Sequence, residues 1–319
     1  MPHSSQLSAR PGHAWLRRWG AAGVLCCWAG CLLEAPALAG EALPGVVRDY
    51  ISELCASPGP EHTARRPMQR AVIAMETSAW ALACAREDVD GDGDVGETHQ
   101  STTWDVRCSD PGDSRFERLA SQLTRLLTRP EIAPLDVGIV TYSGRLSGGI
   151  QSPTSNDARV AIPLGSDPAL AIRLPVDLRP THADDVLVPN YAAAIHVADR
   201  ELQRSDAGSP EPGGAPPAEG VLLVAFSRRE DPPDWGGEIV KVIEAARTAF
   251  SHGHPVFFVE LADPRDPHRV FKPAPASADL AEVARRCAGG RTAAAWDRDL
   301  GGVLRDFLLA IPGEHLLRR

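Results

Sequence analysis

The apolar residues of this chain alternate between two kinds of spacing, and the alternation predicts an α/β protein. Short apolar runs typical of buried strands occupy 71–75, 136–143, 158–164, 221–227, 255–262 and 292–296. Between them, apolar residues recur at helical spacing and predict helices at 114–127, 190–203, 239–250, 277–287 and 299–311. Because most strands are apolar throughout, we expect a doubly wound, Rossmann-like, mostly parallel sheet with helices on both faces.

Polar residues between these runs mark helix ends and loops. Ser114 and Glu117 form a capping box at the start of the first helix of the domain. The apolar residues that line one face of this helix are Phe116, Leu119, Ala120, Leu123, Leu126 and Leu127. Segments 56–67 and 205–220 break regular structure and predict a linker and a flexible break.

These boundaries predict a chain of four parts. The parts are a signal peptide at 1–39, an amphipathic helix with its linker at 40–66, one α/β domain at 67–313 and a short tail at 314–319. The domain carries an acidic insertion at 85–108 between its first strand and its first helix.

The first 39 residues have the organisation of an export signal. The positive n-region contains Arg10, Arg17 and Arg18. The apolar run 19–33 follows and is too short to span a bilayer, and Ala37-Leu38-Ala39 offers a cleavage site. A bacterial lipobox ending at Cys31 is the alternative, so the type of signal peptidase stays open. We expect an exported chain, periplasmic or secreted, with no transmembrane segment after the signal.

Charge and cysteine content agree with export and exclude one class of partner. Removal of 1–39 leaves 30 basic and 41 acidic residues, a net charge of −11, which disfavours binding of nucleic acid through its phosphates. The four remaining cysteines are Cys55, Cys84, Cys108 and Cys287, and they allow three pairings. We favour Cys84–Cys108, which would brace the acidic insertion, with Cys55–Cys287 as its complement.

The acidic insertion contains the strongest candidate for a metal site. In "DVDGDGDVGE" (88–97), the spacing D-x-D-x-D-G matches the start of an EF-hand calcium loop. We expect the side chains of Asp88, Asp90 and Asp92 and the carbonyl of Asp94 to bind Ca²⁺, with a sharp reversal at Gly93. His99 replaces the usual glutamate at position 12, and Glu97 or a water is a possible substitute. The alternative is a disordered acidic insertion.

The order of segments resembles a von Willebrand factor A (vWA) domain of the bacterial exported type. "AVIAMETSAW" stands where the family has a strand ending in D-x-S-x-S, and "LDVGIVTYSG" is similar to its second strand. "SDPGDSRFERLASQLTRLL", "NYAAAI" and "ADLAEVARRCAGGR" are similar to its first, third and late helices. The resemblance implies a parallel sheet with one antiparallel edge strand and a protein-binding function.

In that family a metal-ion-dependent adhesion site (MIDAS) lies at the upper edge of the sheet, and the resemblance implies a degenerate version here. The matching positions are Glu76, Ser78, Trp80, Pro189 and Ser227, with Asn190 beside them. Only Ser78 keeps the family's ligand, while Glu76 is one methylene longer than the aspartate it replaces. We therefore do not expect Mg²⁺ at this position.

Signatures of common α/β enzymes do not occur in the sequence. It has no G-x-S-x-G elbow, no P-loop and no G-x-G-x-x-G after a strand. His252 and His254 are interpreted as residues at a helix end rather than as metal ligands, and His196 as a helix-surface residue. We expect a non-catalytic module that binds a protein partner in the cell envelope or outside the cell. The alternatives are an adhesin with a rearranged metal site of Glu76, Ser78 and Asn190, and an enzyme or maturation factor with active residues on loops.

Overall fold

The computed structural model confirms the α/β class. It describes residues 51, 55, 69–100, 106–143, 157–167, 189–205, 218–226, 235–262, 275–290, 292–296 and 300–309. The expected signal peptide, almost all of the first helix, the 56–67 linker, Ser227 and the C-terminal tail lie outside these residues.

Within the described residues, six strands form the central sheet, in the order β5-β4-β1-β6-β7-β8. They are β1 (Arg70–Glu76), β4 (Asp136–Tyr142), β5 (Ala158–Ile162), β6 (Glu219–Phe226), β7 (Val256–Ala262) and β8 (Thr292–Trp296). All neighbours pair in parallel except β5, which pairs with β4 in the antiparallel direction at one edge. This arrangement is the one implied by the vWA resemblance, and each strand agrees with its predicted range to within two residues.

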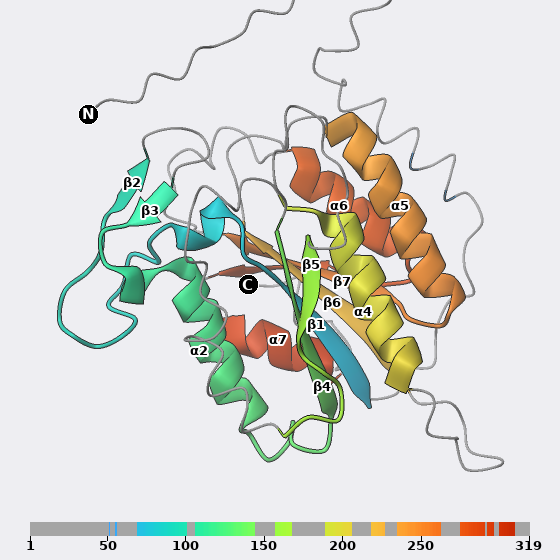
Figure 1. The fold of residues 1–319 in the computed structure, drawn as a ribbon, viewed down its shortest axis with the longest axis horizontal. Coiled ribbons are helices and arrows are strands. Elements are labelled where there is room, and N and C mark those ends of the chain that lie inside the picture. The colour runs from blue at the N-terminus through green and yellow to red at the C-terminus, as the bar shows by residue number, and fades with distance from the viewer. Residues whose placement is uncertain are drawn as a thin grey trace, which may run out of the picture. The chain divides into compact units, whose positions relative to one another are not determined.

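Helices cover both faces of the sheet (Figure 1). Helices α4 (Tyr191–Ser205), α5 (Trp235–Ser251) and α6 (Pro275–Cys287) lie on one face, and α2 (Arg115–Leu127) and α7 (Leu300–Leu308) lie on the other. α5 begins four residues before the first residue of its predicted apolar pattern.

The alternation of side chains along β1 explains why two helical layers are needed. Val72 and Ala74 pack in the core under α4, α5 and α6, whereas Ile73 and Met75 pack in the core under α2 and α7. The side chains of Val72, Ile73 and Met75 each contribute about 1.5–3 kcal/mol when they are buried. A central strand that is apolar on both faces is therefore stable only between two layers.

Local signals in the sequence set the helix starts as predicted. Ser114 is the N-cap of α2, and its hydroxyl accepts a hydrogen bond from the Glu117 amide at 3.2 Å. The side-chain oxygen of Asn190 accepts one from the Ala193 amide at 2.9 Å at the start of α4. Both caps satisfy amides that have no partner within the helix.

Two disulfides link cysteines of the described residues, one across 232 positions of the chain and one across 24. Cys55 is bonded to Cys287 at the end of α6, with a Cα–Cα distance of 5.1 Å, and Cys84 is bonded to Cys108 at 4.7 Å. This is the pairing that we favoured among the three.

A short hairpin between the first strand and α2 was not predicted. Its strands are β2 (Thr98–Gln100) and β3 (Val106–Cys108), which pair in the antiparallel direction. The turns η1 (Ala79–Leu82) and η2 (Pro111–Asp113) flank the insertion. The hairpin strands are three residues long and mostly polar, so they carry no apolar alternation that would have indicated them.

None of the helices in the described part of the chain is long and apolar enough to cross a membrane.

Candidate functional site

The strand order places a potential binding position at the carboxyl ends of β1 and β6. The chain passes from β1 to β4 and β5 on one side, and then returns to β6, β7 and β8 on the other side. In open α/β sheets, ligands bind where the strand order reverses in this way. Glu76 is the last residue of β1 and Phe226 is the last residue of β6. We call these two residues, together with Ser78, the switch point.

Internal hydrogen bonds occupy the carboxylate of Glu76. The side chain is 0% exposed, as is that of Ser78. The Ser78 hydroxyl donates to one carboxylate oxygen of Glu76, and the Phe226 amide donates to the other at 2.9 Å. Glu76 therefore links the ends of β1 and β6.

The neighbouring residues also have structural partners. The amide and the hydroxyl of Thr77 both donate to the Tyr142 carbonyl, at 2.8 and 3.1 Å, which fixes the end of β1 against β4. The Tyr142 hydroxyl donates to the Val224 carbonyl on β6 at 2.8 Å. Three adjacent strands are thus bonded to one another at this edge.

The other described positions of the degenerate adhesion site are buried or have hydrogen-bond partners of their own. Trp80 is buried in the core under α2 and α7. Pro189 is buried, and Asn190 caps α4 while its amide donates to Asp157 at 2.9 Å. Ser227 lies outside the described residues. An Mg²⁺ or Ca²⁺ ion needs several oxygen ligands that converge on it. The described residues at the switch point do not form such a shell. Glu76 and Ser78 bond to each other, Asn190 caps α4, and no group of three converging His, Cys, Asp or Glu side chains lies among the described residues there.

The acidic insertion has the local geometry of a tight loop. The carboxylate of Asp88 accepts hydrogen bonds from the amides of Gly91 at 2.6 Å and Gly93 at 3.1 Å. Gly93 has φ of 98°, which is the reversal expected at this position. Asp90 and Asp92 each accept from the amide two residues later, at 3.2 and 2.9 Å.

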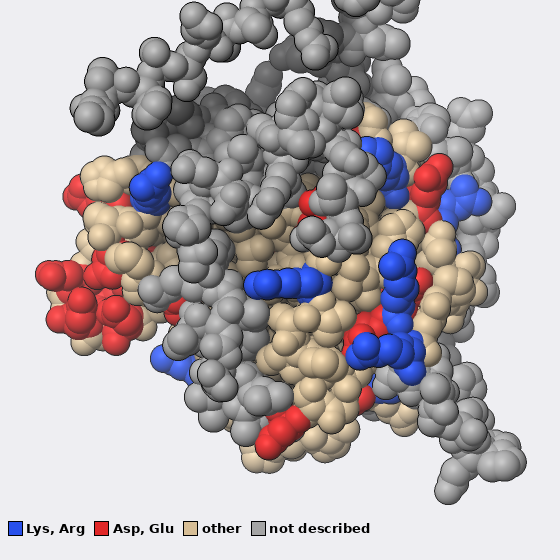
Figure 2. All heavy atoms as spheres, in the orientation of Figure 1, with Lys and Arg blue, Asp and Glu red and all other residues tan. Residues whose placement is uncertain are grey.

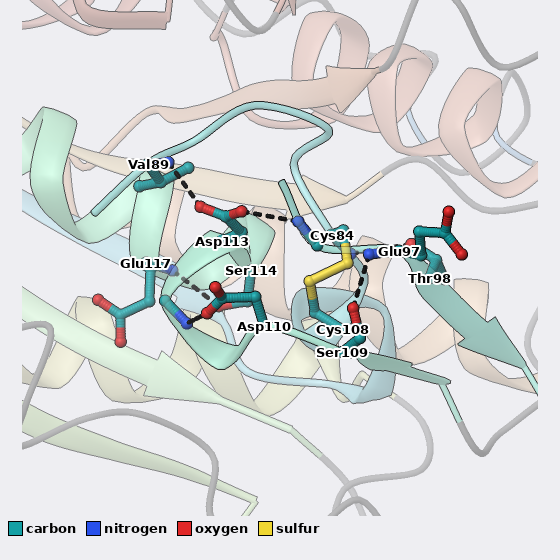
Figure 3. Close-up of a disulfide and its surroundings, with 12 residues drawn as sticks. Cys84, Val89, Glu97, Thr98, Cys108, Ser109, Asp110, Asp113, Ser114 and Glu117 are labelled. Carbon is teal, nitrogen blue, oxygen red and sulfur yellow. Dashed lines mark hydrogen bonds between the residues drawn. A yellow bond between two sulfur atoms is a disulfide. The ribbon is translucent and has the colours of Figure 1, made fainter. Parts of the chain in front are cut away.

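One buried carboxylate outside the predicted motif holds this loop in place. Asp113 is 0% exposed, and its two oxygens accept from the amides of Val89 at 2.6 Å and Gly96 at 2.8 Å (Figure 3). It therefore bridges the two ends of the loop. The Cys84–Cys108 disulfide lies beside it, and a Cβ added to Gly96 would stand 2.4 Å from the Cys108 sulfur.

Two groups of carboxylates in this region could hold a metal ion. Asp88, Asp90 and Asp113 form one group and Asp90, Asp92 and Asp110 form the other, with one oxygen of each residue within 4.8 Å of those of its partners. Figure 2 shows the acidic side chains gathered at the left, over this loop. Asp94 and Glu97 are exposed and belong to neither group, and the Glu97 amide bonds to the Ser109 hydroxyl at 2.8 Å.

Asp110 and Asp113 were not predicted as ligands. Both follow Cys108 closely, in the segment that leads into α2. The favoured Cys84–Cys108 disulfide was a signal that could have found them, because it brings the residues after Cys108 beside those after Cys84. A search for ligands within one continuous motif leaves such residues out.

The chain resembles known proteins in structure rather than in sequence. No protein-family model matches it, and no curated protein matches its sequence. Among solved structures, it is similar to the human COPII-coat protein Sec24c, with 13% identity and a TM-score of 0.43, over 76% of this chain and 32% of that one. It is also similar to the pilus adhesin SpaC from Lactobacillus rhamnosus GG, with 10% identity and a TM-score of 0.45, over 78% of this chain and 31% of the adhesin.

A third similar structure is the TFIIH p34 N-terminal domain, with 13% identity and a TM-score of 0.38, over 77% of this chain and 99% of that domain. This chain spans about a third of the length of the coat protein and of the adhesin. Similarities at this level do not indicate a function for this chain.

Proposed function

We propose that this chain is an exported, non-catalytic vWA-like module that binds a protein partner in the cell envelope or outside the cell. The family assignment is supported by the order of motifs in the sequence and by the sheet with its antiparallel edge strand β5. Export is supported by the signal-like first 39 residues and by two disulfides, which persist in oxidising compartments.

The observation that carries the proposal is the occupied carboxylate of Glu76. A metal-dependent adhesin places an ion at the switch point and leaves one coordination position open for a carboxylate of the partner. Here Glu76 is fully buried and bonded to Ser78 and Phe226. Recognition at this edge would therefore use the surface of the protein itself rather than an ion.

The acidic loop supplies the second part of the proposal, a structural Ca²⁺ site. Carboxylate oxygens are the ligands that Ca²⁺ prefers, and the three-carboxylate groups share Asp90. An ion bound there would neutralise exposed acidic side chains that otherwise repel one another. Its role would be to order the loop beside the binding edge.

Partner capture tests the functional proposal. Residues 40–319, with both disulfides formed, are immobilised and incubated with the envelope and culture fractions of the source cells, with and without EDTA. We expect the same protein to be captured in both conditions and by the variant Ser78→Ala. The Ser78→Ala variant distinguishes the two proposals. It would remove a ligand from an adhesion site of Glu76, Ser78 and Asn190, but capture without a metal ion would not depend on it.

Other outcomes of the same experiment point elsewhere. Capture that disappears in EDTA and returns with Mg²⁺ would support the rearranged adhesin and contradict our proposal. Capture that disappears in EDTA and returns only with Ca²⁺ would show that partner binding uses the acidic loop. Hydrolysis of generic ester or phosphate substrates by the purified chain, lost in a loop variant, would show an enzyme instead.

A further inference from the structure

A buried cluster of charged side chains lies where the parallel strands of the sheet begin, at the end opposite to the switch point. It contains Arg70 at the start of β1, Asp199 on α4, Glu219 at the start of β6, and His254 in the turn before β7. Arg70 and Glu219 are register partners and form an ion pair. The side chain of His254 is only 4% exposed, so its partners within the protein determine its charge.

Both ring nitrogens of His254 face carboxylates. Nδ1 lies 2.8 Å from Oδ1 of Asp199, and Nε2 lies 3.2 Å from Oε2 of Glu219. An ionised carboxylate oxygen accepts hydrogen bonds but cannot donate one. A neutral imidazole has a single N–H and would leave one nitrogen lone pair pointing at a carboxylate. With both carboxylates ionised, a doubly protonated, positively charged ring is the state that satisfies both contacts.

The balance of charge in the cluster agrees with this protonation state. Glu219 is paired with Arg70, whose guanidinium also donates to the Leu202 carbonyl of α4 at 2.8 Å. Asp199 also faces Nδ1 of His252 at 3.0 Å at the surface. With His254 charged, the two buried carboxylates are matched by two cations. With His254 neutral, the interior keeps an uncompensated negative charge, which is costly.

The pKa shifts of His254 and Asp199 also favour a charged imidazole ring. Burial by itself would lower the pKa of His254, but its hydrogen bonds to Asp199 and Glu219 outweigh burial and raise the pKa to about 9. Burial would likewise raise the pKa of Asp199, but hydrogen bonds from His254 and His252 hold it below its ordinary value.

We propose that His254 is a pH-sensitive latch, which joins α4 to the starts of β6 and β7 while its ring is an imidazolium and whose contribution to stability is lost when the ring gives up a proton to solvent. The charged or titratable groups that face the latch are Asp199 from α4, Glu219 from β6, Arg70 from β1 and His252 from the turn after α5. Helix α5 contributes the Ala249 carbonyl, which accepts from the His254 amide at 3.0 Å. This inference does not depend on the proposed partner binding.

The direct test is a titration of the folded chain by NMR of the histidine ring nitrogens. We expect the His254 ring to carry protons on both nitrogens at neutral pH and to titrate near 9. The chain unfolded in urea is the control, since its histidines titrate near about 6.5. Variants Asp199→Asn and Glu219→Gln should each lower the midpoint of His254. A ring with one proton at neutral pH, or a midpoint near 6.5 in the folded chain, would overturn the latch.

A stability measurement tests the loss of the latch. The folded-state pKa of His254 lies above its unfolded value, so its contribution to stability is complete below about pH 6.5 and is lost as the pH rises through about 9. The urea midpoint of the wild type should therefore fall across this window more than that of His254→Gln, in which the residue has no proton to lose. Parallel pH profiles of the two proteins would contradict the proposal. If His254→Gln does not fold, the titration of the wild-type ring remains decisive.

Discussion

At the scale of single residues, the side chain at position 76 shows how one methylene changes the use of a site. The vWA resemblance places an aspartate there, and the longer Glu76 reaches the Phe226 amide on the neighbouring strand. A carboxylate that would face a metal in the family instead bonds within the protein. The substitutions led us to expect no Mg²⁺ at this position, which stays a prediction. The hydrogen bonds of Glu76 depend on β6 and could not be predicted from the motif.

Asp90 is the residue whose replacement should affect cation binding most, because it belongs to both carboxylate groups of the acidic loop. We expect Asp90→Asn to weaken Ca²⁺ binding by roughly tenfold or more, since it removes a charged oxygen ligand from either arrangement. Asp94→Asn is the matched control, because its side chain lies in neither group and only its carbonyl was expected to bind. Isothermal titration calorimetry measures both. The absence of any heat in the wild type at millimolar Ca²⁺ would contradict the calcium site itself.

At the scale of elements, the hairpin β2–β3 and the acidic loop depend on contacts that are distant along the chain. The Ser109 hydroxyl accepts a hydrogen bond from the Glu97 amide, and the Asp113 carboxylate accepts one from the Gly96 amide. The Cys84–Cys108 disulfide closes the insertion. The helices and strands of the domain could be predicted because each has its own apolar period. The hairpin could not, since its short polar strands have no apolar pattern of their own and β3 is held by the disulfide at Cys108.

Removal of the Cys84–Cys108 disulfide should therefore loosen one element and leave the sheet intact. Replacing both cysteines with serine should lower the free energy of unfolding by about 3 kcal/mol and weaken Ca²⁺ binding, because the disulfide brings Asp110 and Asp113 to the loop. The double serine variant of Cys55 and Cys287 is the control. It should also lose stability but keep the Ca²⁺ affinity of the wild type, as measured by calorimetry. Equal losses of affinity in both variants would count against a role for this disulfide in shaping the loop.

At the scale of the whole molecule, the two edges of the sheet have different chemistry. The carboxyl ends of the parallel strands hold the hydrogen-bonded switch point, with the acidic loop on the path from β1 to α2. Their amino ends hold the buried His254 cluster. The fold class and the antiparallel edge strand followed from the spacing of apolar residues and from the family resemblance. The His254 cluster did not, because its members come from four segments and His254 read alone is only a histidine near a helix end.

The central claim is that a divalent cation has a place at the acidic loop and none at the switch point. Titration of the folded chain with Mn²⁺ tests it directly, because Mn²⁺ accepts the same oxygen ligands and broadens the NMR signals of nearby amides. We expect the amides of Gly91, Gly93 and Asp94 to broaden first, while those of Thr77 and Asn190 stay sharp. Early broadening of Thr77 and Asn190 would place the ion at the switch point and contradict this account.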